Sequence, residues 1–126
     1  MPISIEYRVP YADTDQMGVV YYANFFVYFE RVRTEVLREL GLTYRQMETD
    51  GLMLPVIEAT CHYHSPALYD DVLDLRGHFE PLSATRLRAV CEVYRGDVRL
   101  ASGHTIHVCL HADSRRPTRL PPVLRP

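Results

Sequence analysis

The first residues of the chain alternate between apolar and polar side chains. A period of two residues is typical of a strand that buries one of its faces. Pro10 then follows, and proline cannot donate a hydrogen bond to a neighbouring strand. The pattern predicts a strand over residues 3–9, with one buried face that carries Ile3, Ile5, Tyr7 and Val9.

The next apolar run has the period of a helix. Its apolar residues recur every three or four positions, which places them on one helical face; they are Phe25, Phe29, Val32, Val36 and Leu40. Asn24 in front of the run is a typical N-cap residue, and Gly41 behind it is typical of the position after a helix. The pattern predicts one long helix between these two residues. Thr43 and Gln46 then have the spacing of a capping box, which predicts a short second helix closed before Gly51.

After Pro55 the pattern returns to strands. Four segments bounded by Pro, Gly, Asp or Ser have strand character; they cover residues 56–65, 72–79, 85–94 and 98–111. Arg95, Gly96 and Asp97 indicate a tight hairpin between the last two. The order of elements predicts an α+β fold, in which one long helix covers a roughly five-stranded antiparallel sheet. The tail from about residue 115 contains four prolines and is predicted to be irregular.

Length and charge restrict the possible classes of protein. The 126 residues, 47% of them hydrophobic, suit a single domain over residues 1–126. The net charge of −2 gives no broad basic field, so we expect no nucleic-acid partner. The first residues lack a signal-peptide pattern and no apolar run approaches ~18 residues, so we expect a cytoplasmic protein without a membrane span. The aromatic start of the helix exposes too much apolar surface for one small sheet to cover, which predicts a homo-oligomer.

The cysteines and histidines do not indicate a metal site. Cys61, Cys91 and Cys109 are 30 and 18 residues apart, which is neither a CxxC pair nor zinc-ligand spacing. They are predicted to be reduced and buried. His62 and His64 fall on one face of a predicted strand, but no third ligand lies at a suitable spacing, so we expect no bound metal.

The segment between the first strand and the long helix carries the candidate chemistry. It contains Asp13, Asp15 and Gly18, followed by a helix whose first N–H groups have no partner within the helix. These donors and the helix dipole can stabilise a carbonyl oxygen that gains negative charge. A nearby carboxylate can attack that carbonyl or activate a water. The residues alone equally allow two solvated loop acids and a glycine that permits a tight bend.

A family resemblance favours the catalytic interpretation. The run D-x-D-x-x-G-V-V-Y-Y over residues 13–22, followed by a helix, resembles the signature of the 4-hydroxybenzoyl-CoA thioesterase family. The loop over residues 66–73 and the tripeptide Ala101-Ser102-Gly103 also resemble family segments, so the resemblance covers nearly the entire chain. It implies a hot-dog fold, dimers that often pair into tetramers, active sites at subunit interfaces, and no metal or other cofactor, because CoA is part of the substrate.

The resemblance assigns roles to three residues of the motif. Asp15 matches the family's catalytic acid, and Tyr22 matches the residue whose backbone N–H polarises the thioester carbonyl. Gly18 matches the glycine that permits close approach. Asp13 is interpreted as a structural acid of the turn.

Three further residues are predicted to contact the substrate. Glu30 matches an acidic helix position that can face the acyl pocket. Leu54 is apolar where a relative that acts on a hydroxylated aromatic acyl group has a hydroxyl side chain, which favours a general acyl-CoA hydrolase. Arg86 follows the loop over residues 81–85 and is predicted to contact the phosphates of CoA.

The sequence therefore predicts a thioesterase that hydrolyses a short-chain or aromatic acyl-CoA. Asp15 would act as nucleophile or as general base, and the sequence does not choose between the two. One alternative is a non-catalytic module that binds acyl-CoA. Another is an acyl-thioester hydratase or dehydratase, which needs a histidine and an acid together, and the motif contains no histidine.

Overall fold

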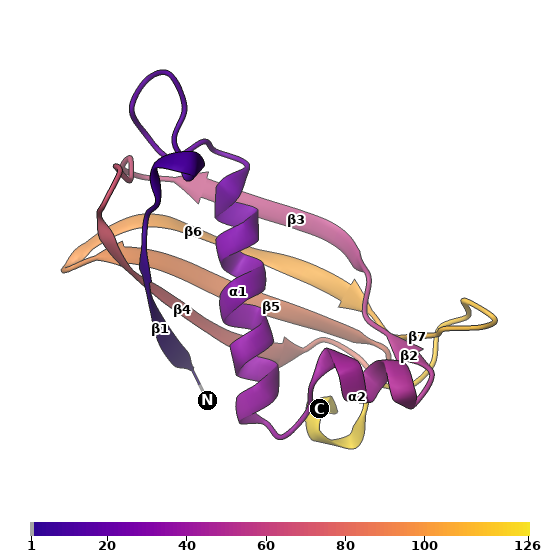
Figure 1. The fold of residues 1–126 in the computed structure, drawn as a ribbon. Helices are drawn as coiled ribbons and strands as arrows, with labels where there is room; N and C mark the ends of the chain where they lie inside the picture. The colour runs from indigo at the N-terminus through magenta and orange to yellow at the C-terminus, as the bar shows by residue number, and fades with distance from the viewer. Residues whose placement is uncertain (1) are drawn as a thin grey trace.

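The computed structural model describes residues 2–126, in which one long helix crosses a face of a five-stranded antiparallel sheet (Figure 1). The strand order is β1-β4-β5-β6-β3. This confirms the predicted α+β class with a long helix against five antiparallel strands. The elements are β1 (Ile3–Arg8), α1 (Asn24–Glu39), β3 (Val56–Tyr63), β4 (Val72–Pro81), β5 (Arg86–Arg95) and β6 (Val98–Val108).

Helix α1 buries the apolar stripe that its sequence predicts. Leu40 of the stripe is half-buried, and the other four residues are at most 3% exposed. The helix packs mainly on β4, with β1 and β5 on either side. Gly77 of β4 makes room for this contact, because a Cβ there would lie only 3.1 Å from a methyl group of Val32.

The C-terminus of α1 is as predicted, whereas its start is different. Gly41 has a φ of +82°, and its N–H donates to the Arg38 carbonyl, which closes the helix. At the start, the N-cap is Ala23 and Asn24 is already the first helical residue. The prediction of Asn24 as N-cap was therefore wrong. Its side-chain amide donates instead to the Asp13 carbonyl at 2.9 Å.

The segment after α1 contains the predicted short helix and a small second sheet. Helix α2 (Tyr44–Thr49) begins with the predicted cap, in which the Thr43 hydroxyl accepts from the Gln46 N–H at 3.0 Å. β2 (Leu52–Met53) pairs with β7 (Leu110–His111). The last long strand is therefore shorter than the predicted 98–111, because its final residues leave the large sheet.

The C-terminal tail packs against the molecule although it forms little regular structure. It contains only the short 3-10 helix η2 (Pro122–Leu124). Leu120 and Leu124 are buried in a second apolar cluster, together with Leu37 and Met47 from the helical segments. Within residues 2–126, no helix combines the length and the apolar composition needed to cross a membrane.

Candidate functional site

The segment that precedes α1 forms a tight loop that projects beyond the helix N-terminus (Figure 1). The Asp15 N–H donates to the Val19 carbonyl at 2.9 Å, and the Gly18 N–H donates to the Asp15 carbonyl at 3.0 Å. Gly18 has a φ of +80°, a left-handed conformation that residues with a Cβ rarely adopt. Gly18 therefore allows the chain to turn back toward the helix.

The Asp15 carboxylate is half-buried in this loop and has capacity for a further partner. Its Oδ1 accepts from the Met17 N–H at 2.9 Å, and within residues 2–126 no other donor reaches it. Tyr21 lies nearby: its pKa is raised by interaction with the Tyr22 hydroxyl and, to a smaller extent, by the Asp15 charge. The carboxylate thus lies beside the residues that lead into α1.

Asp13 connects the same segment to β1 and α1 through hydrogen bonds. Its Oδ2 accepts from the hydroxyls of Tyr7 and Tyr28, at 2.7 Å each. Its carbonyl oxygen accepts from the Tyr21 N–H and from the Asn24 side chain. Burial, reinforced by the Asp13 carboxylate, raises the pKa of Tyr7 to about 12. These bonds connect β1, α1 and the loop, in agreement with the structural role predicted for Asp13.

Tyr22 provides a free backbone N–H at the N-terminus of α1. The Tyr21 carbonyl, which belongs to the same peptide unit, accepts from the Asn24 N–H at 2.9 Å. A trans peptide directs its C=O and N–H to opposite sides, so this bond also fixes the direction of the Tyr22 N–H. No acceptor for that N–H is present in the part of the chain that the structure describes. The N–H lies at the positive end of the helix dipole.

A largely apolar cavity of about 300 Å³ is lined in part by Tyr22. Tyr63, from the end of β3, and Phe25, from the first turn of α1, face each other edge to face with ring centroids 5.3 Å apart. Such a cavity can bind an apolar group whose carbonyl points to the helix N-terminus. Its lining residues are Val19, Val20, Tyr22, Phe25, Tyr63, His64, Ser65 and Pro66.

The three predicted catalytic residues lie in one continuous segment. Gly18 shapes the loop, Asp15 is held within it, and Tyr22 lies where the loop meets α1. Asp15 does not line the cavity beside Tyr22 within one subunit. The catalytic roles of Asp15, Gly18 and Tyr22 stay predictions.

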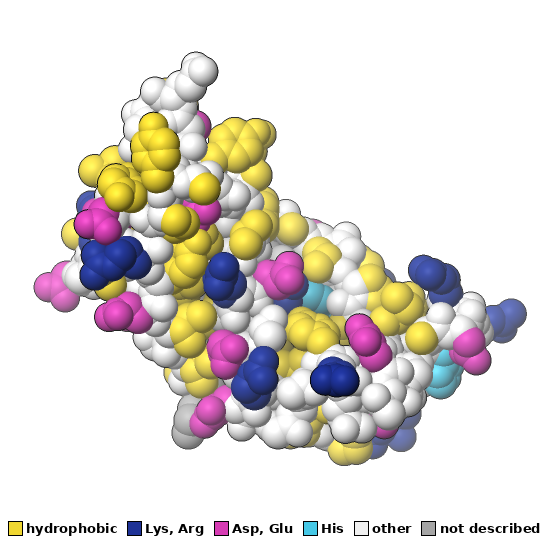
Figure 2. Space-filling model, viewed as in Figure 1, with side chains coloured by type: hydrophobic (Ala, Val, Ile, Leu, Met, Phe, Trp, Pro, Cys, Tyr) yellow, Lys and Arg dark blue, Asp and Glu magenta, His cyan; other side chains and the backbone are white. Residues whose placement is uncertain are grey.

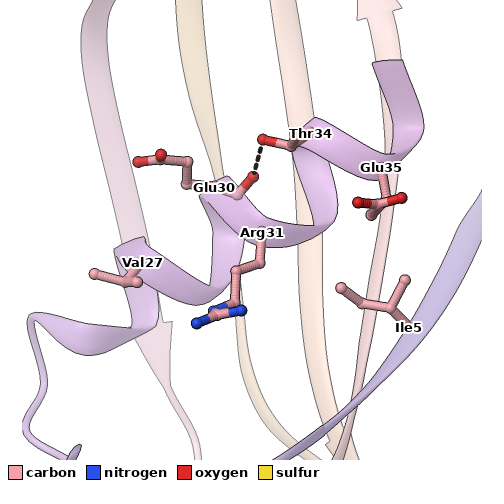
Figure 3. Close-up of a pocket in the computed structure, with 6 residues that line it drawn as sticks. All are labelled: Ile5, Val27, Glu30, Arg31, Thr34 and Glu35. Atoms are coloured by element: carbon pink, nitrogen blue, oxygen red, sulfur yellow. Dashed lines mark hydrogen bonds between the residues drawn. The ribbon is translucent and has the colours of Figure 1, made fainter. Parts of the chain in front are cut away.

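Glu30 lies on an exposed part of α1, at a different cavity. This cavity, of about 360 Å³, is bordered by α1 and by Ile5 of β1 (Figure 3). Figure 3 shows the Glu30 carboxylate pointing away from Ile5, and the Thr34 hydroxyl donates to the Glu30 carbonyl at 2.8 Å. Within one subunit, Glu30 and Tyr22 therefore do not share a cavity, and the predicted contact of Glu30 with substrate is untested.

Leu54 and Arg86 lie away from Tyr22 within the subunit. Leu54 packs against the second apolar cluster, and its carbonyl accepts from His107 Nδ1 at 2.9 Å. Arg86 is exposed at the start of β5, where it pairs with Val108 of β6. The structure thus separates the two residues from the proposed catalytic segment, and their predicted substrate contacts also stay predictions.

Sequence reasoning missed the wall of the cavity that comes from β3 and the residues after it. Tyr63 and His64 are about 40 positions beyond the motif, and only the fold brings them next to Tyr22. His64 is paired with the Ser102 hydroxyl at 2.9 Å and not with an acid. Figure 2 shows hydrophobic side chains gathered at the end of the molecule that carries the loop, and Tyr11, Met17, Tyr22 and Tyr69 are among the exposed ones. This gathering depends on the fold and has no signal in the sequence pattern.

Comparison with known proteins identifies similar sequences. Residues 9–126 match the family model of the thioesterase-like superfamily. The chain is 30% identical over 115 residues to the acyl-CoA thioester hydrolase YbgC of Escherichia coli, a match that covers 90% of this chain and 86% of that protein. It is 31% identical over 115 residues to the 1,4-dihydroxy-2-naphthoyl-CoA hydrolase of Thermosynechococcus vestitus, covering 90% of this chain and 79% of the other.

Solved structures with the same fold include an enzyme of related name. A 1,4-dihydroxy-2-naphthoyl-CoA thioesterase from Synechocystis, Slr0204, superposes with a TM-score of 0.90 at 27% sequence identity. The superposition covers 98% of this chain and 92% of that one. The similarity therefore extends over the whole arrangement of sheet, helix and the loop that precedes the helix.

Proposed function

Because the chain belongs to the thioesterase-like superfamily, has the hot-dog fold of that superfamily and is a thioester hydrolase, we propose that it converts a short-chain or aromatic acyl-CoA to the free acid and CoA. The match to the thioesterase-like superfamily confirms the resemblance at the level of the superfamily. The narrower assignment to the 4-hydroxybenzoyl-CoA thioesterase family stays a prediction.

The observation that carries the proposal is that Tyr22, whose backbone N–H has no acceptor in the described part of the chain, helps to line an apolar cavity. In thioester hydrolysis, negative charge develops on the carbonyl oxygen as the nucleophile attacks. A donor that is already oriented stabilises this charge without reorganisation, and the helix dipole acts in the same direction. The cavity beside Tyr22 receives the acyl group, so that the thioester carbonyl lies against the N–H.

Asp15 supplies the second half of the chemistry. Its carboxylate attacks the thioester carbon to form an anhydride, or it takes a proton from the water that attacks. CoA then leaves as the thiolate. A single turnover in ¹⁸O-water can identify the anhydride route, because water that opens the anhydride at the Asp15 carbonyl leaves its label in the enzyme. General-base catalysis places the label only in the product acid, as does an anhydride opened at the acyl carbon.

The open side of the cavity is completed by a second copy of the chain. Asp15 and the cavity wall are separate within one subunit, and the predicted family places its active sites between subunits. A neighbouring copy would bring further residues to the cavity, and Glu30, Leu54 and Arg86 are the predicted substrate contacts in such an assembly. We propose that this assembly works in the cytoplasm.

The acyl group is proposed as short or aromatic because the cavity of about 300 Å³ is lined in part by the aromatic side chains of Tyr22, Phe25 and Tyr63. The relatives named above act, by their names, on acyl-CoA and on 1,4-dihydroxy-2-naphthoyl-CoA. The direct measurement is thiol release from acyl-CoAs of graded chain length and aromaticity. Binding of these compounds without thiol release would favour the non-catalytic alternative and contradict the proposal.

Replacement of Asp15 by asparagine tests the role of the carboxylate. We expect Asp15→Asn to lower kcat at least ~100-fold, because general acid–base groups contribute at least that factor, while thermal unfolding stays at the wild-type temperature. Asp97→Asn, in the exposed β5–β6 hairpin, is the matched control and should keep full activity. Wild-type hydrolysis by Asp15→Asn would remove Asp15 from the mechanism.

A further inference from the structure

Tyr63 connects the sheet to the backbone at the start of α1. Its hydroxyl donates to the Tyr22 carbonyl oxygen at 2.9 Å, although the two residues are 41 positions apart in the sequence. The same oxygen accepts from the Phe25 N–H at a longer 3.3 Å. The carbonyl therefore has one donor from its own helical turn and a closer one from β3.

This hydrogen bond fixes the peptide unit next to the proposed oxyanion donor. The Tyr22 C=O and the Ala23 N–H belong to one planar unit, so the orientation of one sets the orientation of the other. On the other side of Tyr22, the bond from the Asn24 N–H to the Tyr21 carbonyl fixes the unit that contains the Tyr22 N–H. Tyr22 is thus restrained on both sides, by its own turn and by Tyr63.

The Tyr63 ring has a separate contact with the cavity. It packs edge to face on Phe25, at 5.3 Å between ring centroids, and on Tyr22, at 6.4 Å. Partial burial raises the pKa of Tyr63 to about 12, so its hydroxyl keeps its proton at neutral pH and remains a donor. The hydroxyl and the ring therefore contribute to different parts of the site.

We propose that Tyr63 is a positioning residue for thioester hydrolysis, whose hydroxyl holds the Tyr22 backbone in the orientation that directs its N–H at the developing oxyanion. The inference rests on the proposed function. An oriented donor stabilises the transition state more than the bound substrate, so the hydroxyl contributes to kcat. The ring forms part of the cavity wall and contributes to substrate binding.

Two substitutions separate the hydroxyl from the ring. Tyr63→Phe removes only the hydroxyl, and we expect kcat to fall about 10-fold while KM stays within about 2-fold of wild type, the size expected for one lost hydrogen bond. Tyr63→Leu also removes the ring and should raise KM in addition. Tyr69→Phe is the matched control: Tyr69 is exposed, its ring packs on Tyr11, and it does not line the cavity.

A second measurement reports on the backbone independently of turnover. In the ¹⁵N spectrum of Tyr63→Phe, the Ala23 amide should shift, because the carbonyl of its peptide unit loses a donor, and it should not shift in Tyr69→Phe. An active wild type together with an unchanged kcat in Tyr63→Phe, or an unchanged Ala23 resonance, would overturn the positioning role alone. A wild-type protein that releases no thiol from any acyl-CoA would overturn the thioesterase proposal and this inference with it.

Discussion

The Asp13 carboxylate provides a hydrogen-bond acceptor for a buried hydroxyl in the first turns of α1. Tyr28 is 1% exposed, and a buried hydroxyl without a partner is costly. Asp13 accepts from Tyr28 and from Tyr7 of β1 with the same oxygen, while its backbone carbonyl binds the chain just before the helix. Only two positions separate Asp13 from Asp15, yet their environments give them different roles. Asp13 fixes the loop, and Asp15 is left with capacity for a substrate or a water.

A second buried series of hydrogen bonds connects α1 to the segment before β3. Arg33 Nη1 donates to the Thr105 hydroxyl at 3.3 Å, and that hydroxyl lies 2.8 Å from His107 Nε2. His107 Nδ1 lies 2.9 Å from the Leu54 carbonyl oxygen, which can only accept, so Nδ1 carries the proton. In the neutral imidazole, Nε2 is then the acceptor for Thr105. All of these hydrogen bonds can form together only while His107 is neutral, because a protonated Nε2 can no longer accept from Thr105.

This arrangement predicts that the fold is less stable below neutral pH. Burial lowers the pKa of His107 below its ordinary value of 6.5. Below about pH 6.5, His107 therefore binds a proton in the unfolded chain, whereas the folded protein resists this protonation. The contribution of neutral His107 to the free energy of unfolding is complete above that pH and is lost as the pH falls through the folded-state pKa of His107. The free energy of unfolding, measured by urea denaturation at pH 7, 6 and 5, should decrease accordingly.

Substitution of the histidine tests the assignment. His107→Gln should be less stable at pH 7 and should show a smaller decrease between pH 7 and 5 than the wild type. His111→Gln, at an exposed position, is the control and should follow the wild-type curve. An identical pH dependence in His107→Gln and wild type would show that other groups cause the decrease.

At the scale of elements, the sequence predicted those features that depend on neighbours in the chain. The apolar stripe of α1, the turn at Gly41 and the cap at Thr43 all have local signals, and the structure confirms them. The start of α1 was misplaced because Asn24 finds a partner eleven residues away at Asp13. The small sheet of β2 and β7, like the packing of the tail, depends on contacts between distant segments, for which two-residue strands and scattered leucines give no periodic signal.

Gly103 of β6 shows how a residue in a strand can limit the packing of a helix. A Cβ at this position would overlap the Thr60 carbonyl oxygen of β3 and lie 2.9 Å from the Phe29 ring of α1. We expect Gly103→Ala to lower the free energy of unfolding by more than about 3 kcal/mol, because backbone must move to relieve the overlap. Gly77→Ala on β4 should cost only about 1 kcal/mol, because the Cβ would meet side-chain methyl groups of Val32 that can shift.

Urea denaturation of the two variants measures this difference under the same conditions. Equal costs for Gly103→Ala and Gly77→Ala would contradict the argument. If Gly103→Ala does not accumulate as a folded protein while Gly77→Ala does, the expected order is still obtained.

At the scale of the whole molecule, the sequence indicated the proposed catalytic segment but not the cavity beside it. Asp15, Gly18 and Tyr22 lie within eight consecutive residues, so a motif could indicate them. Tyr63 comes from another strand, and its hydrogen bond to Tyr22 depends on the sheet being folded. Glu30, Leu54 and Arg86 lie at separate places on one subunit, so any shared role depends on an assembly that one chain does not contain.

The sheet itself indicates where a second subunit would bind. Helix α1 covers mainly β4 and its neighbours β1 and β5, and β3 is left at the edge of the sheet. Val56, Ile57 and Tyr63 of β3 are between 46% and 48% exposed. An exposed apolar edge strand is a template for pairing with another chain. A symmetric pair of such edges would join two sheets and bring two α1 N-termini with their cavities to one interface.

We therefore predict that the protein is a homodimer joined through β3, and that a charge on this edge separates the subunits. Ile57→Lys should raise the dimer dissociation constant at least about 10-fold, a cost of about 1.4 kcal/mol, as measured by sedimentation velocity over a concentration series. Val98→Lys is the control, because Val98 is 47% exposed at the β5–β6 hairpin, away from the edge strand. A wild-type protein that sediments as a monomer would contradict the prediction.

Where the site spans two subunits, kcat/KM of Ile57→Lys should fall in proportion to the fraction of dimer, because a separated subunit retains Asp15 and Tyr22 but lacks the residues that close the cavity.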